Sequence, residues 1–185
     1  MKLPAEDKFK TDSFRIAIAG NPNSGKSTLF NVLTGLNQKI GNYPGVTVDK
    51  KIGYFSFSPL SDGEGLARPA PLVGRVRSKE AIIIDLPGAY GLQKQSEDER
   101  ISTEVITDKT NPDYPDIVIY VADASNLKRS LLFFTQIFDR EVPVVLALNM
   151  MDVAGKKGLE INTEKLSPGV WSTVCWSCYP RLGFF

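Results

Sequence analysis

Apolar residues occur along this chain in blocks of two kinds. The short blocks are nearly continuous runs rich in Val, Ile, Ala and Leu, as in strands that are buried on both faces. The predicted strands are 14–19, 52–57, 81–85, 117–122 and 144–148. The longer blocks have helical spacing, and the predicted helices are 27–34, 96–107, 127–138 and a short one at 163–166. This alternation predicts an α/β fold with a mostly parallel central sheet and helices on both faces.

The longest interruption of the pattern lies between the second and third predicted strands. Residues 59–78 contain three prolines and three glycines, so we predict a surface loop that connects an antiparallel hairpin. The chain then divides into an N-terminal arm at 1–13, one domain at 14–166 and a tail at 167–185. A length of 185 residues fits a single domain with a substantial core.

Charge and composition exclude several classes of protein. The net charge is +1 with both signs spread along the chain, which argues against a dominant nucleic-acid or anionic-membrane surface. No apolar run reaches the roughly 18–20 residues that span a bilayer. The N-terminus lacks the apolar segment of a signal peptide. We therefore expect a soluble, cytoplasmic domain without direct membrane contact.

The chain has no histidine and two cysteines, Cys175 and Cys178, in a C-x-x-C spacing. A zinc site would need two more ligands of the usual kind, which the chain lacks. A redox pair would be expected in a strand–helix context that is absent here. We interpret the spacing as coincidental.

The clearest chemical signal is the segment Gly20-Asn21-Pro22-Asn23-Ser24-Gly25-Lys26-Ser27. It matches G-x-x-x-x-G-K-[ST], the P-loop, and it lies between a predicted strand and a predicted helix, where the motif functions. Backbone N–H groups would surround the phosphates, Lys26 would reach the β- and γ-phosphates, and the Ser27 hydroxyl would hold Mg²⁺. A Gly-rich turn with a chance match is the alternative. The predicted phosphate-binding residues are Gly20, Asn21, Pro22, Asn23, Ser24, Gly25, Lys26, Ser27 and Thr28.

A second candidate segment is Gly45-Val46-Thr47, in the loop after the first predicted helix. The Thr47 hydroxyl could bind Mg²⁺, and its backbone N–H could meet the γ-phosphate. An ordinary turn after Tyr43-Pro44 explains the same residues. All three residues are predicted to bind nucleotide, and Thr47 to take part in hydrolysis.

A third segment, Asp85-Leu86-Pro87-Gly88, comes directly after a predicted strand. Ligands in open α/β sheets bind beyond the carboxyl ends of the strands. Asp85 could there hold Mg²⁺ through a water molecule, and the Gly88 N–H could meet the γ-phosphate. An Asp-initiated turn is the alternative, but after a P-loop and a strand the nucleotide-binding interpretation is favoured.

A fourth segment, Asn149-Met150-Met151-Asp152, follows another predicted strand and matches N-x-x-D. Asp152 could accept hydrogen bonds from the N1–H and N2–H₂ edge of guanine, while Asn149 reads the N7/O6 side. Adenine has no such pair of donors, so this arrangement would discriminate against it. The alternative is that Asp152 caps a helix.

The order of these motifs resembles that of the Ras-type, translation-factor-like GTPases. The residues within the motifs indicate a smaller family. The chain looks like the N-terminal G domain of FeoB-type ferrous iron transporters, from about Phe14 to about Leu166. Besides the P-loop, the segments that carry the resemblance are Gly41–Val48, Asp85–Tyr90, Ser96–Glu99, Asp123–Leu127 and Pro143–Asp152.

The resemblance implies a Ras-like P-loop GTPase fold, GTP or GDP and Mg²⁺ as ligands, and a regulatory role. In such transporters the G domain is cytoplasmic and lies at the inner membrane, and its partner is the transport domain of the same longer protein. Ala89 stands where many GTPases place a glutamine, so hydrolysis is expected to be slow. Asn23 matches the asparagine that binds K⁺ in the potassium-stimulated members, or it merely caps the loop. The predicted catalytic residues are Lys26, Thr47, Gly88 and Asn23.

Two parts of the chain depart from this family pattern. The 59–78 loop is longer than expected, and the resemblance stops after about Leu166. We expect the C-terminal strand and helix to be incomplete or divergent, as a truncation or frame shift in a longer gene would leave them. A genuine divergent C-terminus is the alternative.

Two other functions share the same motifs. A stand-alone soluble GTPase in ribosome assembly or RNA modification would usually carry a basic RNA-binding module, which the balanced charge does not supply, and no nucleic-acid partner is expected. A module that binds nucleotide without turnover fits the altered tail but not the intact Lys26, Ser27, Thr47 and Asp85. The sequence therefore favours a GTP-hydrolysing regulatory domain of a ferrous iron transporter.

Overall fold

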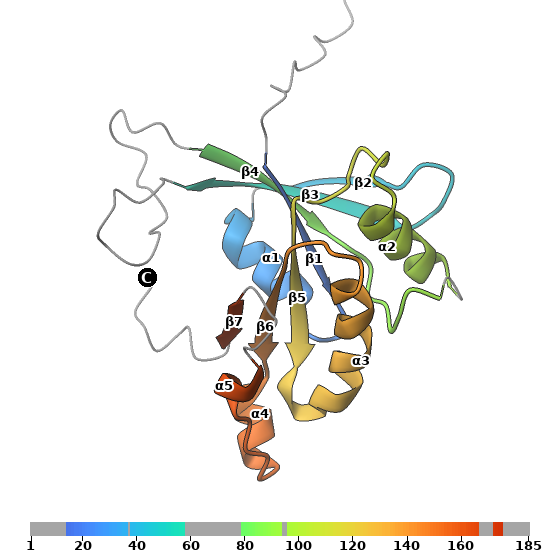
Figure 1. Cartoon of the computed structure of the whole chain (residues 1–185). Helices are drawn as coiled ribbons and strands as arrows, with labels where there is room; N and C mark the ends of the chain where they lie inside the picture. Colours follow the sequence, from blue (N-terminus) through green and yellow to red (C-terminus); the bar gives the residue numbers. More distant parts are fainter. Residues whose placement is uncertain (1–13, 37, 58–78, 94–95, 167–171, 176–185) are drawn as a thin grey trace, which may run out of the picture.

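In the computed structural model, the described residues form a central sheet of seven strands in the order β2-β3-β4-β1-β5-β6-β7 (Figure 1). The structure describes residues 14–36, 38–57, 79–93, 96–166 and 172–175. The strands are β1 (Phe14–Gly20), β2 (Gln38–Asn42), β3 (Asp49–Phe57), β4 (Lys79–Asp85), β5 (Ile117–Asp123), β6 (Val144–Asn149) and β7 (Ser172–Cys175). Strands β4, β1, β5, β6 and β7 are parallel, whereas β3 is antiparallel to β2 and β4. The predicted mostly parallel α/β sheet is confirmed.

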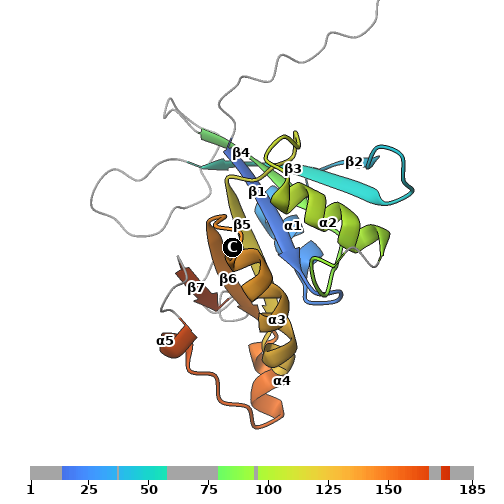
Figure 2. The same ribbon diagram turned by 45° about the vertical axis from the view of Figure 1, so that its right-hand side comes forward.

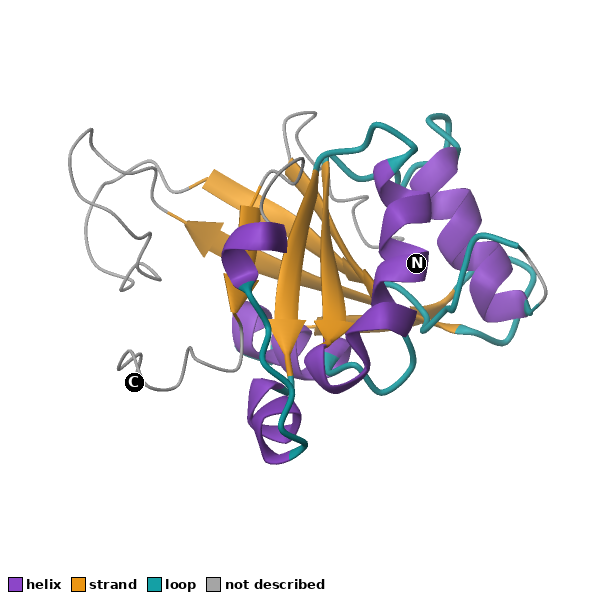
Figure 3. Ribbon diagram, turned by 60° about the horizontal axis from the view of Figure 1, so that its bottom comes forward, coloured by secondary structure: helices purple, strands orange, loops and turns teal. Residues whose placement is uncertain are grey.

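Helices cover both faces of the sheet, as the sequence predicts (Figures 2 and 3). Helix α1 packs through Leu29 and Phe30 on one face, while α2 and α3 contribute Ile106 and Phe133 to the core on the other. Because both faces are covered, the central strands are apolar over most of their length. The helices are α1 (Lys26–Thr34), α2 (Glu97–Thr107), α3 (Leu127–Phe138), α4 (Met151–Lys156) and α5 (Thr163–Leu166).

Strand β1 shows how the continuous apolar pattern serves two cores. Ala17 and Ala19 belong to the cluster beneath α2 and α3, whereas Ile18 between them belongs to the cluster beneath α1. Successive side chains of a strand point to opposite faces, so an amphipathic pattern would leave one core incomplete. Gly20 then ends the strand at the P-loop, which places the loop at the carboxyl edge of the sheet.

Several elements differ from the predictions. The edge strand β2 was not predicted because its five residues are all exposed, so it lacks an apolar face. The short helix α4 was also missed. The predicted antiparallel hairpin is confirmed by the β3–β4 pairing, which runs from Lys51 opposite Asp85 to Phe57 opposite Lys79. The predicted loop connecting these strands lies outside the described residues.

The C-terminal strand expected to be incomplete or divergent is present in short form. Strand β7 pairs in parallel with β6, from Ser172 opposite Val145 to Cys175 opposite Leu148. A strand therefore occupies this edge of the sheet, although the residues after about Leu166 were expected to depart from the family pattern. The N-terminal arm, Cys178 and the rest of the tail lie outside the described residues. The prediction of a divergent closing helix falls on these residues and stays a prediction.

Gly53 in β3 is a position where the packing admits no side chain. A Cβ atom there would lie 2.1 Å from Cγ2 of Thr34 and 3.1 Å from Cζ of Phe30. We expect Gly53→Ala to lower the free energy of unfolding by about 1–3 kcal/mol, because α1 would have to move away from the sheet. Gly41→Ala on β2 is the matched control, since a Cβ there meets nothing within 4 Å. Urea unfolding measures both, and equal stability of the two variants would contradict this packing.

Among the described residues, no helix combines the length and the apolar character needed to cross a bilayer.

Candidate nucleotide-binding site

The P-loop connects β1 to α1 and bends sharply at two residues with positive φ, Asn23 (61°) and Gly25 (95°). Gly25 is required for space as well as for conformation. A Cβ atom at this position would lie 2.1 Å from Nδ2 of Asn149. The loop leads directly into the first turn of α1, where Gly25 is the N-cap and makes no side-chain capping bond. Backbone N–H groups at such a helix start are suited to bind an anion.

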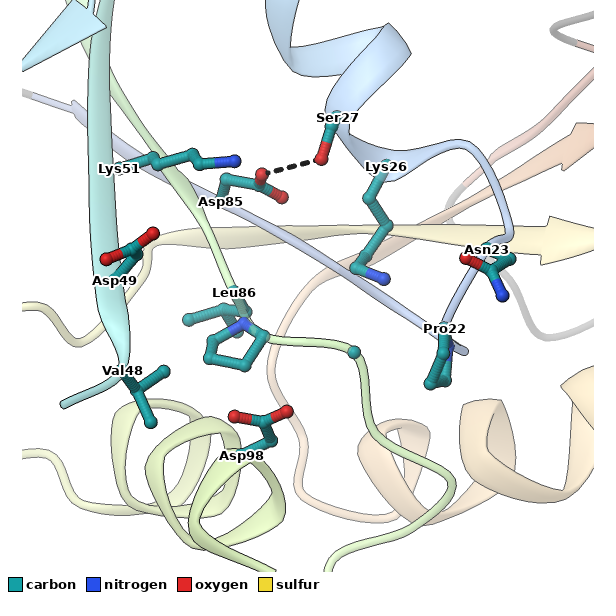
Figure 4. Close-up of a pocket in the computed structure, with 12 residues that line it drawn as sticks. Pro22, Asn23, Lys26, Ser27, Val48, Asp49, Lys51, Asp85, Leu86 and Asp98 are labelled. Atoms are coloured by element: carbon teal, nitrogen blue, oxygen red, sulfur yellow. Dashed lines mark hydrogen bonds between the residues drawn. The ribbon is translucent and has the colours of Figure 1, made fainter. Parts of the chain in front are cut away.

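A pocket of about 340 Å³ opens beside this loop (Figure 4). A volume of this size is at the lower end for small-molecule sites. Its walls come from the P-loop, the start of β3, the end of β4 and the first turn of α2. The lining residues are Pro22, Asn23, Lys26, Ser27, Val48, Asp49, Lys51, Asp85, Leu86, Pro87, Gly88 and Asp98.

Lys26 is an almost fully buried lysine at the start of α1, with 8% of its surface exposed. Its Nζ donates a hydrogen bond to the backbone oxygen of Asn21 at 2.9 Å. Burial lowers the pKa of Lys26, and the negative charges of Asp85 and Asp98 oppose that shift. A desolvated ammonium with one neutral partner is well placed to bind a negatively charged ligand.

Ser27 and Asp85 form the polar centre of the pocket. The Ser27 hydroxyl donates to Oδ2 of Asp85 at 3.2 Å, whereas Oδ1 of Asp85 is buried and finds no hydrogen-bond partner within the part of the chain that the structure describes. Burial raises the pKa of Asp85, and the Ser27 hydrogen bond and the charges of Lys26 and Lys51 partly offset that effect. A hydroxyl beside a carboxylate with a free oxygen is the donor set that Mg²⁺ prefers, so these residues fit the predicted metal.

The segment after Asp85 packs tightly against the P-loop. The backbone N–H of Ala89 donates to the Gly20 oxygen at 3.3 Å, and that of Leu86 donates to the Ile18 oxygen at 3.0 Å. The Ser102 hydroxyl of α2 donates to the Pro87 oxygen at 3.0 Å. A Cβ at Gly88 would lie 2.9 Å from Cα of Pro22, so only glycine allows this close approach.

The N-x-x-D segment reaches the site through Asn149, at the end of β6. Its Nδ2 donates to the backbone oxygen of Ser24 at 2.9 Å, which joins residues 125 positions apart. Asp152 lies exposed in the first turn of α4, and Met150 is the N-cap of that helix. The alternative that Asp152 is the capping residue is therefore wrong. Met151 is partly buried against the core instead of facing the pocket.

The segment Gly45–Thr47 is not brought to the pocket. Thr47 is exposed in the connection between β2 and β3, and the next two residues, Val48 and Asp49, line the pocket in its place. The same connection is anchored by Tyr43, which is buried beneath the Nζ of Lys50 at 5.6 Å from the ring centroid. Binding of Mg²⁺ by Thr47 therefore requires this connection to move.

The predicted residues thus fall into two groups. The residues that line the pocket are Pro22, Asn23, Lys26, Ser27, Asp85, Leu86, Pro87 and Gly88. The residues that do not line it are Gly20, Asn21, Ser24, Gly25, Thr28, Gly45, Val46, Thr47, Asn149, Met150, Met151 and Asp152. Asn21, Ser24 and Asn149 nevertheless shape the P-loop, because Asn21 accepts from Tyr120 and Ser24 accepts from Asn149.

Three charged lining residues were not predicted, namely Asp49, Lys51 and Asp98. Asp49 and Lys51 are two positions apart on β3, and this spacing places both side chains on one face of a strand. Asp98 belongs to the acidic first turn of α2. The sequence shows both patterns, but it does not show which surface they face.

These features define a P-loop nucleotide-binding protein with a Ras-like α/β fold. The model of the ferrous iron transport protein B family matches residues 14–62 and 72–176. The chain therefore belongs to the ferrous iron transport protein B family, as the sequence motifs indicated. The match ends at residue 176, so the resemblance continues past Leu166, the boundary expected from the motifs. Its gap at 63–71 lies within the predicted 59–78 loop.

Relatives and solved structures agree with this assignment. The Fe(2+) transporter FeoB of Leptospira biflexa is 44% identical over 151 residues, which cover 82% of this chain and 19% of the relative. FeoB of Legionella pneumophila strain Lens is 44% identical over 153 residues, covering 80% of this chain and 17% of the relative. The chain thus spans about a fifth of the length of these relatives.

The structural likeness extends over most of the chain. The cytosolic domain of L. pneumophila FeoB matches with a TM-score of 0.68 and 40% identity, covering 86% of this chain and 56% of that one. The GMPPNP form of the cytosolic domain of T. maritima FeoB matches with a TM-score of 0.69 and 35% identity, covering 86% and 55%. The predicted fold class is confirmed.

Proposed function

We propose that this chain binds guanine nucleotides and hydrolyses GTP slowly, as the regulatory G domain of a ferrous iron transporter. The observation that carries the proposal is the convergence of Lys26, Ser27 and Asp85 on one pocket. Asn149 donates a hydrogen bond to the backbone of Ser24 in the P-loop, and other residues of that loop line the pocket. Solved structures of FeoB domains with GDP and GMPPNP support the choice of nucleotide.

Each part of the pocket has a distinct task in this proposal. Lys26 exchanges the neutral Asn21 oxygen for the phosphates. Their negative charge makes them a stronger hydrogen-bonding partner for a desolvated ammonium. Ser27 and Asp85 would hold Mg²⁺, which would stabilise the negative charge of the phosphates. Thr47 would bind the same ion only with its loop in another position, and the Gly88 N–H would donate to the terminal phosphate. Asp152 recognises the guanine edge.

Ala89 distinguishes this site from GTPases that orient the attacking water through a glutamine. Its methyl group is buried, with 1% exposed, and has no polar atom. Asn23 instead lines the pocket with an exposed amide at the tip of the P-loop. An amide oxygen is a suitable ligand for K⁺, which supplies positive charge beside the phosphates when it is bound.

The potassium role of Asn23 predicts a salt-specific rate of hydrolysis. GTP turnover should be about ten-fold or more faster in K⁺ than in Na⁺ at equal ionic strength. Asn23→Gly should abolish that difference, because glycine keeps the left-handed backbone of Asn23 (φ 61°) and removes only the amide. Asn23→Ala should also lose the K⁺ advantage, but alanine adds some strain because it does not favour this left-handed backbone conformation.

Equal parent rates in the two salts would reject the potassium role and leave the nucleotide site in place. A K⁺ advantage that persists in Asn23→Gly would assign the cation to other ligands. Absence of any turnover, with GDP still bound, would favour a module that binds nucleotide without hydrolysis.

The membrane context is part of the same proposal. Since the chain spans about a fifth of its relatives, we propose that it acts at the cytoplasmic face of the inner membrane, coupled to the transport domain of a longer protein. A stand-alone role in ribosome assembly or RNA modification is not favoured, because the relatives described above are Fe(2+) transporters. Iron uptake by cells that express the full-length protein, with and without Lys26→Ala, tests this coupling.

A further inference from the structure

Lys51 is a second lysine in the nucleotide pocket, and none of the sequence motifs includes it. It lies on β3 directly opposite Asp85 of the antiparallel neighbour β4. Opposed residues on paired strands place their side chains on the same face of the sheet, within reach of one another. Both residues line the pocket, and Figure 4 shows the Lys51 side chain extending across toward Asp85.

The neighbouring lysine, Lys50, points the other way. Its Nζ lies over the ring of Tyr43 and forms an ion pair with Asp113 at 2.5 Å. It does not line the pocket. Two adjacent lysines of one strand therefore face different surroundings, as the alternation of side chains along a strand requires.

Without a metal, a nearby positive charge would offset the unfavourable burial of the Asp85 carboxylate. Asp85 is 7% exposed, and Oδ1 of its carboxylate has no hydrogen-bond partner among the described residues. Lys26 and Lys51 are the two lysines that line the pocket together with Asp85. Lys26, however, donates to the Asn21 oxygen of the P-loop and is assigned to the phosphates. Lys51 lines the pocket from β3, where Asp49 shares its face and also lines the pocket.

We propose that Lys51 is the resident counter-ion of Asp85 and that its charge opposes the binding of a divalent metal at this site. The inference rests on the proposed function, because it assumes that Asp85 helps to hold Mg²⁺. A positive side chain beside the carboxylate makes binding of the metal alone unfavourable. The metal then binds tightly only together with the phosphates, whose negative charge outweighs Lys51. Lys51 thus determines how strongly metal occupancy depends on the nucleotide.

Manganese provides a direct test, because free and bound Mn²⁺ are distinguished by electron paramagnetic resonance. The full chain is loaded with GDP without metal and titrated with Mn²⁺ as the parent, Lys51→Gln, Lys51→Arg and Lys50→Gln. We expect Lys51→Gln to bind Mn²⁺ about five-fold more tightly than the parent, since a nearby repulsive charge is lost. Lys51→Arg keeps the charge and should match the parent. Lys50→Gln removes the same charge from the opposite face of β3 and should also stay close to the parent.

The results separate failure of this inference from failure of the proposed function. Equal Mn²⁺ affinity of Lys51→Gln and Lys50→Gln would overturn the counter-ion role, because the effect would then be one of net charge. Weaker binding by Lys51→Gln would also overturn it and would assign Lys51 to the support of the phosphates. A parent chain that does not bind GDP at all would instead refute the guanine-nucleotide function.

Discussion

Lys26→Ala should weaken the binding of GDP and GTP by at least about a hundred-fold. Truncating one partner of a buried, hydrogen-bonded charge pair costs about 2–5 kcal/mol, and the phosphates have no other cation so deeply placed in the P-loop. The unliganded protein should change little in stability. Burial already lowers the pKa of this lysine, so removing its charge also removes a desolvation penalty.

Isothermal titration calorimetry with GDP and GTP measures this loss of affinity. Lys128→Ala is the matched control, because Lys128 is exposed on α3 and does not line the pocket. The control should bind like the parent. If Lys26→Ala retained parent affinity, the P-loop of this chain would not be the phosphate site. Urea unfolding without nucleotide verifies that the variant is folded.

Asp152→Asn should reverse the base preference of the site. The variant should bind GDP about a hundred-fold or more weakly and should gain affinity for xanthosine diphosphate. The physical reason is complementarity: an asparagine amide can donate to the carbonyl that xanthine has where guanine has an amine. Asp152 is exposed in this structure, but a bound base would cover it, and a covered polar group that the base leaves unpaired lowers the affinity.

Competition between labelled GDP and unlabelled GDP, xanthosine diphosphate or ADP measures the preference. Asp139→Asn is a suitable control, because Asp139 is an exposed aspartate at the end of α3. Asp152 also lies in the first turn of α4. There its charge is worth about 0.3–1 kcal/mol of helix stability, too little to explain a change in base preference. Equal binding of ADP and GDP by the parent would contradict the assignment of Asp152.

The motif residues show where prediction from sequence succeeds and where it fails. Lys26, Ser27 and Asp85 meet in one pocket as expected, because each follows or begins an element with a strong local signal. Thr47 does not, because its neighbours Val46 and Val48 pack against the core while Thr47 itself is exposed. Asp49 and Lys51 line the pocket in that region, and their charges alone did not distinguish a site from a solvated strand face.

By itself, the sequence determined the elements that depend on local pattern. The apolar run before Gly20 and the helical spacing after Ser27 define a strand and a helix, so the P-loop between them follows from neighbouring residues. The same holds for the ends of β4 and β6, where Asp85 and Asn149 stand at the carboxyl edge of the sheet.

Only the tertiary structure decided the relations between distant segments. The hydrogen bond from Asn149 to Ser24 joins residues 125 positions apart. The position of Lys51 opposite Asp85 depends on the register of strands β3 and β4. A shift of one residue in that register would exchange the faces of Lys50 and Lys51, so that a different lysine would enter the pocket. Register depends on which residues of both strands pack against the core and on the connection between the strands, so the pattern within β3 alone does not give it.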